Sequence, residues 1–269
     1  MPNHSATPLS HAACSVLMEP SVEAKISLTQ EIADYWASGS IADIGKADPP
    51  DRPARPPRPE LRPPRDMPKR NARGDKGRIT LIHAIEHIEL NAIDLAWDII
   101  ARFTDYNLPR DFYDDWVGVA VDEARHFDLL NVYLSDHDSA YGDFPAHDGL
   151  WQAAEDTAGD LLARLAIVPM VLEARGLDTT PPTIAKLRDV GDDQAADILT
   201  TIVDEEIAHV AAGVRWFNYL CARQNKAPAK TYQTLVKKYF KGQIKPPFAT
   251  AAREQAGFSA EYYQPIAVG

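Results

Sequence analysis

The chain has 269 residues, of which 45% are hydrophobic and 25% charged, as expected for a globular protein with one large domain or one domain plus extensions. Its net charge of −11 argues against general electrostatic binding of nucleic acids, and no apolar run approaches the roughly 20 residues that span a bilayer. The two cysteines, Cys14 and Cys221, and an N-terminus without a basic start and a long apolar stretch indicate a cytoplasmic protein without a disulfide framework.

The N-terminal part of the chain, residues 1–45, is predicted to hold a mobile tail over 1–17 and one or two short helices over 20–37. Residues 46–76 are rich in proline and arginine, and proline cannot continue a helix or a central strand, so we expect an extended segment. Two interpretations of this segment stay open. It is either a linker or strap over the helices, or a basic arm at 52–73 that contacts an anionic partner such as a nucleic acid.

Residues 77–225 are predicted to form four long helices, because apolar side chains recur there at alternating steps of three and four. The expected ranges are 78–103, a helix that opens at Leu108-Pro109, 150–175 with Gly176 as its C-cap, and 192–223 after a short helix at 182–189. Residues 226–269 add a helix at 228–240 and an irregular tail. The predicted fold is all-α: an up-down four-helix bundle with an N-terminal helical and Pro-rich extension and an extra C-terminal helix.

Acidic and histidine side chains interrupt the apolar stripes of these helices. Glu123 and His126 form one Glu-x-x-His pair, and Glu206 and His209 form another. Residues three apart share one helix face, so the carboxylate and the imidazole of each pair can reach a single ion. A buried carboxylate is costly unless it is paired or bound to a metal, which makes two such pairs on apolar stripes a metal-site prediction.

Each pair also has a helical glutamate upstream at nearly the same distance. Glu89 precedes Glu123 by 34 residues, and Glu173 precedes Glu206 by 33. This is the pattern of a duplicated helix pair, and bundles that bind two iron or manganese ions are built in this way. Glu86, spaced by 37 residues, is an alternative ligand to Glu89, and His83, two turns before Glu89, is an alternative that would hydrogen-bond near the site.

The resulting ligand set has four carboxylates and two imidazoles: Glu89, Glu123, His126, Glu173, Glu206 and His209. Four carboxylates balance two divalent ions, and this donor chemistry suits iron or manganese better than zinc or copper. We therefore expect two iron ions, with an iron–manganese pair as the alternative. Such a set leaves coordination positions open, as dioxygen activation requires.

The chain resembles the ferritin-like di-iron superfamily, and within it the DUF455 family. The motifs that carry this resemblance are HAIEHIELNAIDLAWD (83–98), DEARHF (122–127), YGDFPAHDGLW (141–151), VLEARGLD (171–178) and EEIAHVAAGVRWF (205–217). They favour Glu89 over Glu86. The MiaE-type tRNA-modifying di-iron hydroxylases, a related branch, imply a reaction class but no substrate. The bacterial di-iron monooxygenases share the acid-Glu-x-x-His pattern, which implies that Asp122 orients His209 and Glu205 orients His126.

These observations favour a di-iron oxygenase or oxidase that acts on an unidentified substrate with electrons from a partner reductase. Two alternatives stay open: a ferroxidase or other iron-handling protein, and a non-enzymatic bundle stabilised by metal. No membrane partner is expected, and a nucleic acid only through the basic arm. The pattern specifies neither the substrate nor the oligomeric state.

Overall fold

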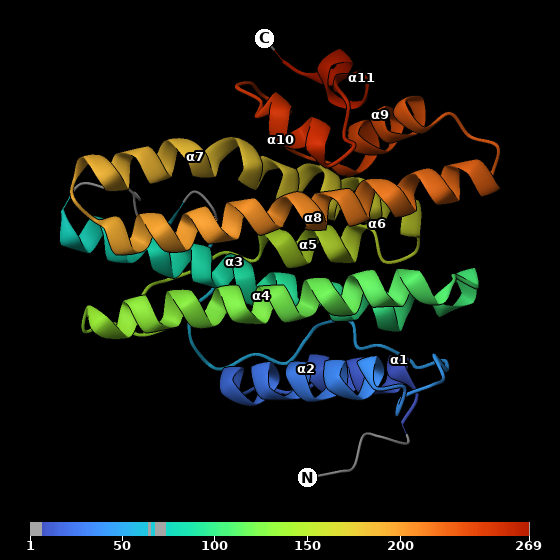
Figure 1. The fold of residues 1–269 in the computed structure, drawn as a ribbon, viewed down its shortest axis with the longest axis horizontal. Helices are drawn as coiled ribbons and strands as arrows, with labels where there is room; N and C mark the ends of the chain where they lie inside the picture. Colours follow the sequence, from blue (N-terminus) through green and yellow to red (C-terminus); the bar gives the residue numbers. More distant parts are fainter. Residues whose placement is uncertain (1–6, 64–65, 68–73, 269) are drawn as a thin grey trace. The chain divides into compact units, whose positions relative to one another are not determined.

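The computed structural model describes residues 7–63, 66–67 and 74–268, and within these ranges the chain is helical (Figure 1). Two isolated bridges, Leu61 with Ala146 and Ile244 with Ala267, are the β-structure of this part. The predicted all-α class is thus confirmed. The chain divides into two compact units, Met1–Trp151 and Gln152–Gly269. No helix within the described ranges has an apolar stretch long enough to cross a membrane.

The first unit is built on two long helices, α3 (Asp75–Arg102) and α4 (Arg110–Asp136), which pack on each other along their length. A short 3-10 turn, η3 (Thr104–Tyr106), connects them, and Asn107 there adopts the left-handed conformation with a φ of 48°. Asparagine tolerates this conformation better than most residues, so the reversal fits its sequence. Trp97 and Trp116 are buried, as a helix pair with facing apolar stripes requires.

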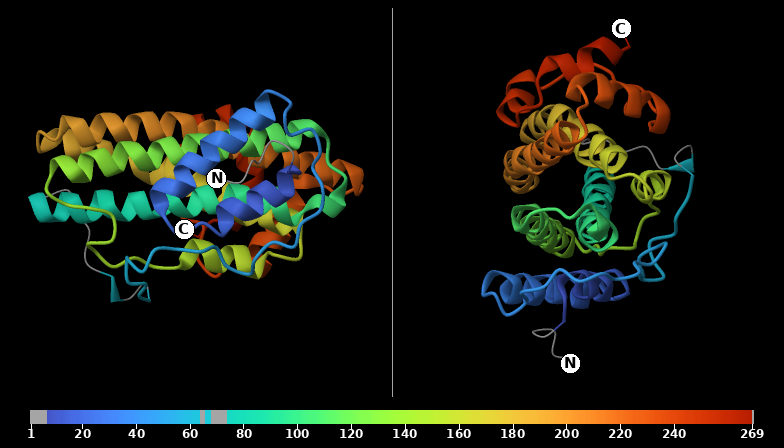
Figure 2. Two further views of the ribbon diagram at one scale, coloured as in Figure 1. Left: turned by 90° about the horizontal axis from the view of Figure 1, so that it is seen from below. Right: turned by 90° about the vertical axis from the view of Figure 1, so that its right-hand side faces the viewer.

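Two shorter helices, α1 (Leu9–Leu17) and α2 (Val22–Ala37), pack on α3 and α4 respectively, as Figure 2 shows. The prediction of a mobile tail over residues 1–17 is wrong for α1. Its face of Leu9, Val16 and Leu17 is fully buried, because α3 offers an apolar surface that a single-sequence pattern does not reveal. Residues 1–6 of the predicted tail lie outside the described residues.

A buried ion pair fixes α2 and the Pro/Arg-rich segment to α3. Lys25 Nζ lies 2.5 Å from Asp94 Oδ1, and the Arg55 guanidinium contacts Asp94 Oδ2 at 2.8 Å. Asp94 and Lys25 are both buried, and two cations therefore satisfy one carboxylate in the interior. Breaking one side of such an arrangement strands the remaining charges, which is strongly destabilising.

Residues 46–63 of the Pro/Arg-rich segment run extended along the first unit (Figure 2). Arg52 contacts Asp148 at 2.5 Å, the Pro50 carbonyl accepts a hydrogen bond from Arg102, and the Asp51 carbonyl accepts one from Trp151. In this unit the segment acts as a strap. Residues 64–65 and 68–73 of the predicted basic arm lie outside the described residues.

The second unit departs from the predicted single helix over 150–175. The structure has α5 (Gly149–Asp156), a turn, α6 (Leu161–Ile167), a π-helical turn η4 (Val168–Glu173) and then α7 (Ala174–Asp189). Asp160 starts α6 by accepting hydrogen bonds from the Leu162 and Ala163 amides. Gly176 is not the predicted C-cap, because the positive φ that ends α7 belongs to Gly191, at 77°.

The π-helical turn packs closely against the next long helix, α8 (Asp193–Arg223), because Gly213 of α8 has no side chain. A Cβ on Gly213 of α8 would lie 2.5 Å from both Cβ and Cγ of Pro169. Pro169 has no amide hydrogen, so it cannot make the regular α-helical bond, and the turn widens there. The glycine thus lets α8 approach the turn whose last residue is Glu173.

The C-terminal residues cover α6 to α8 with α9 (Pro228–Tyr239), α10 (Thr250–Gln255), α11 (Ala260–Tyr263) and the 3-10 turn η5 (Gln264–Ile266). α9 lies where the extra C-terminal helix was expected. Arg253 is buried and donates two hydrogen bonds to Asp178 of α7, at 3.0 and 2.7 Å. This bidentate pair anchors the tail to the second unit.

The contact between Pro169 and Gly213 predicts opposite effects for two glycine-to-alanine substitutions. G213A should destabilise the protein by about 1–3 kcal/mol, because the added methyl group overlaps the proline ring. G118A on α4, where nothing lies within 4 Å of the added Cβ, should raise stability by up to about 1 kcal/mol through helix propensity. Urea unfolding followed by circular dichroism measures both changes. A G213A protein as stable as G118A would show that the close approach is not required.

Candidate metal centre

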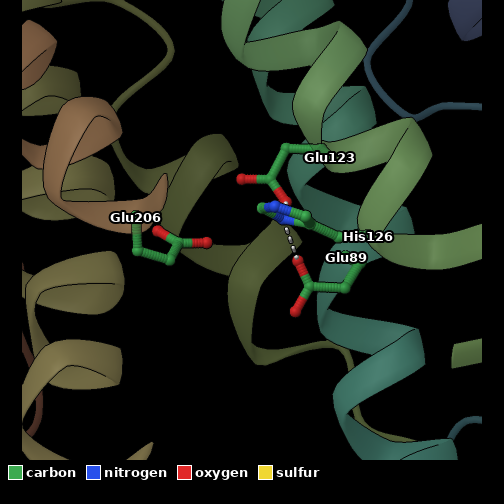
Figure 3. A group of neighbouring side chains, drawn as sticks. All are labelled: Glu89, Glu123, His126 and Glu206. Atoms are coloured by element: carbon green, nitrogen blue, oxygen red, sulfur yellow. Dashed lines mark ion pairs between the residues drawn. The ribbon is translucent and has the colours of Figure 1, made fainter. Parts of the chain in front are cut away.

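One acidic residue of α3 and a Glu-x-x-His pair of α4 form a buried cluster in the first unit (Figure 3). Glu89, Glu123 and His126 are at most 3% exposed, and their ligand atoms lie within 4.8 Å of one another. The His126 Nδ1 atom lies 3.4 Å from Glu123 Oε2 and 3.5 Å from Glu89 Oε2. The helix period places the three side chains on facing stripes of α3 and α4, as the sequence pattern predicts.

The electrostatics of this cluster call for a cation. Burial lowers the pKa of the His126 imidazole, but hydrogen bonds to Glu123 and Glu89 and the charges of both carboxylates outweigh it and raise that pKa to about 11. In the metal-free protein a proton on His126 therefore supplies the positive charge between two buried carboxylates. A divalent ion at the same place would neutralise both carboxylates and leave a neutral imidazole as a ligand.

The second unit carries the matching pair on α8. His209 is 1% exposed, and its Nδ1 atom lies 3.6 Å from Oε2 of Glu206, which is 9% exposed and also drawn in Figure 3. Glu173 is half-buried at the last position of the π-helical turn. Each unit thus presents an upstream glutamate and a buried Glu-x-x-His pair, and the donor chemistry is the same in both.

The donor set fits a hard or borderline divalent cation. Carboxylate oxygens and imidazole nitrogens suit iron, manganese or zinc, and no thiolate takes part, because Cys14 and Cys221 lie elsewhere. The cluster around His126 can therefore hold a metal ion.

The alternative ligand Glu86 has a different environment. It is fully buried, and neither carboxyl oxygen has a hydrogen-bond partner among the described residues. Burial raises its pKa to about 9, so the carboxyl group is protonated and neutral at neutral pH. Its oxygens do not belong to the cluster of converging ligand atoms. The structure therefore favours Glu89 over Glu86 as the ligand on α3.

The remaining predicted residues have contacts of their own. His83 is buried, its Nε2 atom accepts a hydrogen bond from the Gly142 amide at 2.9 Å, and its ring stacks on Tyr141. It thus positions the loop after α4. Asp122 accepts a hydrogen bond from Arg125 at the surface, and Glu205 is half-buried. The bonds predicted from Asp122 to His209 and from Glu205 to His126 would join the two units, and they stay predictions.

A histidine–tyrosine pair between α3 and the loop after α4 was not predicted. His87 Nδ1 lies 2.7 Å from the Tyr141 hydroxyl oxygen, and burial, together with the charge of Arg55, lowers the pKa of His87 to about 3. The pair is therefore neutral. Tyr141 and Phe127 also line a cavity of about 470 Å³ in the first unit, with Arg58 at its rim. No periodicity connects a loop residue to a helix, so the sequence carries no signal for this pair.

Comparisons with known proteins agree with these motifs. A family profile described as "Protein of unknown function (DUF455)" matches residues 18–264. A curated protein of Haemophilus influenzae, described as uncharacterized, is 41% identical over 210 residues, which cover 75% of this chain and 72% of that protein. No solved structure matches the chain.

The buried Glu86 carboxyl predicts a pH dependence of stability in the metal-free protein. Its pKa is about 9 in the folded state against 4.5 in the unfolded chain, so the folded state binds the proton more tightly. The contribution of Glu86 is thus fully present below about pH 4.5 and is lost as the pH rises towards 9. E86Q, which mimics the protonated acid, should match the wild type near pH 5 and exceed its unfolding free energy at pH 8.

Urea unfolding at both pH values, with metal removed by a chelator, measures this difference. E23Q, at an exposed glutamate of α2, is the control and should show no comparable gain at pH 8. An E86Q protein that loses stability equally at both pH values would show that Glu86 carries its charge in the interior.

Proposed function

This chain belongs to the DUF455 family of proteins of unknown function, and we propose that it is a carboxylate-bridged di-iron oxidoreductase that uses dioxygen to oxidise or hydroxylate a substrate. The observation that carries the proposal is the buried cluster of Glu89, Glu123 and His126, repeated in pattern by Glu206 and His209. A surface Glu-x-x-His pair is common on solvated helices. Two copies at most 9% exposed, each preceded by a glutamate, are not explained by solvation.

The proposed centre combines the two halves. In it, α3, α4, the segment from α6 to α7, and α8 form a ferritin-like four-helix bundle, and the ligands are Glu89, Glu123, His126, Glu173, Glu206 and His209. One glutamate from each of two helices and a Glu-x-x-His pair from each of the others is the ligand arrangement of di-iron and di-manganese bundles. The charge supports this assignment, because four carboxylates balance two divalent ions. An iron–manganese pair would use the same ligands.

When bound, the two ions would supply the redox chemistry with dioxygen. The protein's own residues hold the ligands and exclude water. Glu89, Glu123 and His126 lie on regular helices, so their positions are fixed by backbone hydrogen bonds and by packing. Glu173 lies instead at the end of the π-helical turn, and such turns occur frequently at functional sites. Of the four proposed carboxylate ligands, we therefore expect Glu173 to change its position most readily.

The first unit offers a cavity of small-molecule size as a candidate substrate site, and none of the proposed ligands lines it. The 470 Å³ cavity is lined by Phe127, which directly follows His126, and by Tyr141, which is hydrogen-bonded to His87. Its volume lies within the range of small-molecule sites. In the proposed reaction, a separate reductase would supply the electrons. Among the described residues of the basic arm, Arg52, Arg55 and Arg62 pair with acidic residues of the same unit, and a nucleic-acid partner bound through this arm stays a prediction.

If the six ligands form one shared centre, a substitution in either unit should weaken the binding of both ions. E123Q and E206Q should each lower the iron content from two ions to well under one per chain, because a shared centre loses ligands for both ions. Mass spectrometric metal analysis after anaerobic loading with ferrous iron measures this loss. E86Q is the matched control, a buried acid of the same helix pair that should keep both ions. Loss of one ion per variant would indicate two separate sites, and full occupancy in E206Q would contradict the ligand assignment.

The activity predicts a change of iron oxidation state that depends on dioxygen. Mössbauer spectra of the anaerobically loaded protein should show two ferrous ions, and exposure to dioxygen should convert both to ferric iron. With a chemical reductant, oxygen consumption should rise when a substrate is present. Oxygen uptake that needs no substrate and produces an iron mineral would indicate an iron-handling protein. Absence of bound iron or manganese would indicate a bundle without redox chemistry.

A further inference from the structure

A second cavity lies in the second unit, behind the π-helical turn. Its volume is about 210 Å³, and it is bounded by Met170, Val171 and Leu172 of the turn, by Tyr232 of α9, and by the C-terminal segment from Phe240 to Arg253. No residue that we assign to the metal centre lines it. The cavity therefore needs an explanation independent of the proposed oxidoreductase function.

Most of the walls are apolar, and the hydroxyl group of the buried Tyr232 already has a partner. Met170, Phe240 and Phe248 contribute side chains without hydrogen-bonding groups, and the buried Tyr232 donates its hydroxyl hydrogen to the Met170 carbonyl at 3.3 Å. A bound molecule must therefore have an apolar body. Against these apolar walls alone, a small hydrated inorganic anion would lose its water without compensation.

Two of the four charged residues at the cavity neutralise each other. Arg253 donates two hydrogen bonds to Asp178 and a third to the Ala174 carbonyl at 3.2 Å, and its guanidinium lies 5.2 Å from the centre of the Phe248 ring. Because the charges of Arg253 and Asp178 cancel, this pair offers no net charge to a ligand.

The other two charged residues, Arg175 and Lys245, are cations with unused hydrogen-bond donors. Arg175 uses Nη1 to bind the Lys245 carbonyl at 2.8 Å, with Asp178 Oδ2 at 3.4 Å, and this fixes its side chain at the cavity. Within the described ranges, no protein group accepts a hydrogen bond from its Nε or Nη2 atoms or from Lys245 Nζ. The cavity thus has an apolar interior and an excess of positive charge, and a guanidinium with two free donors matches a carboxylate.

We propose that this cavity binds a small organic anion, a monocarboxylate with an apolar body, whose carboxylate pairs with Arg175 and Lys245. The apolar body packs against Met170, Phe240 and Phe248. The volume is below the roughly 300–1,000 Å³ of typical drug-sized sites, so the ligand has the size of a single ring or a short chain. The site is separate from the metal ligands, and the proposal holds whether or not the protein binds iron.

Benzoate and its neutral isostere benzamide test the proposal on the full-length protein. Isothermal titration calorimetry should show benzoate binding, with benzamide weaker by about tenfold or more, because only the carboxylate gains charge-assisted hydrogen bonds. Carbon-13 labelling of the methionine methyl groups locates the ligand. The Met170 signal should shift with benzoate, whereas that of the exposed Met18 should stay unchanged.

K245Q and R175Q should each weaken benzoate binding by about tenfold and leave benzamide binding unchanged. Both side chains are exposed enough for folding to be kept, which circular dichroism checks. K241Q is the matched control, since Lys241 lies on the same segment but pairs with Asp156 outside the cavity. Equal affinity for the two probes, unchanged benzoate affinity in both variants, or no Met170 shift at ~10 mM benzoate would overturn the proposal.

Discussion

The arrangement of this protein depends on how it accommodates carboxylates in its interior. Glu89 and Glu123 are buried on neighbouring helices, and the imidazole of His126 lies within 3.5 Å of both. Without a positive charge between them, the two carboxylates would repel each other and pay the full desolvation penalty. The helix pair of the first unit can pack only because a proton or a metal ion occupies that place. Asp94, on the same helix, is satisfied in another way, by Lys25 and Arg55.

The two carboxylates therefore distinguish two sides of α3, one closed by an ion pair and one facing the candidate metal cluster. On the Asp94 side, protein cations from α2 and the strap neutralise the carboxylate. On the Glu89 side, the partners lie on α4, where the imidazole of His126 is shared by the carboxylates of Glu89 and Glu123. The ion-paired side thus fixes α2 and the strap to the same helix that carries Glu89.

Much of this could be predicted from the sequence. The period of a helix fixes which residues share a face, so Glu89, Glu123 and His126 follow directly from their spacing. The helix boundaries between residues 149 and 189 could not be predicted from the sequence. The π-helical turn at Pro169, for example, packs closely against Gly213 of α8. Gly176 shows the same limit, since a glycine signals a helix end only if its φ becomes positive. The pairing of His87 with Tyr141 depends on a loop conformation that no periodicity encodes.

The position of α1 has a practical consequence for anyone who shortens this chain. The family resemblance begins at residue 18, one residue after α1 ends, so a truncation designed from it would remove Leu9, Val16 and Leu17 from their places against α3. The uncovered surface is an apolar patch of the kind that drives aggregation. An expression boundary chosen from similarity alone would therefore expose the apolar surface of α3, whereas one that starts ahead of Pro8 keeps the hydrophobic face covered.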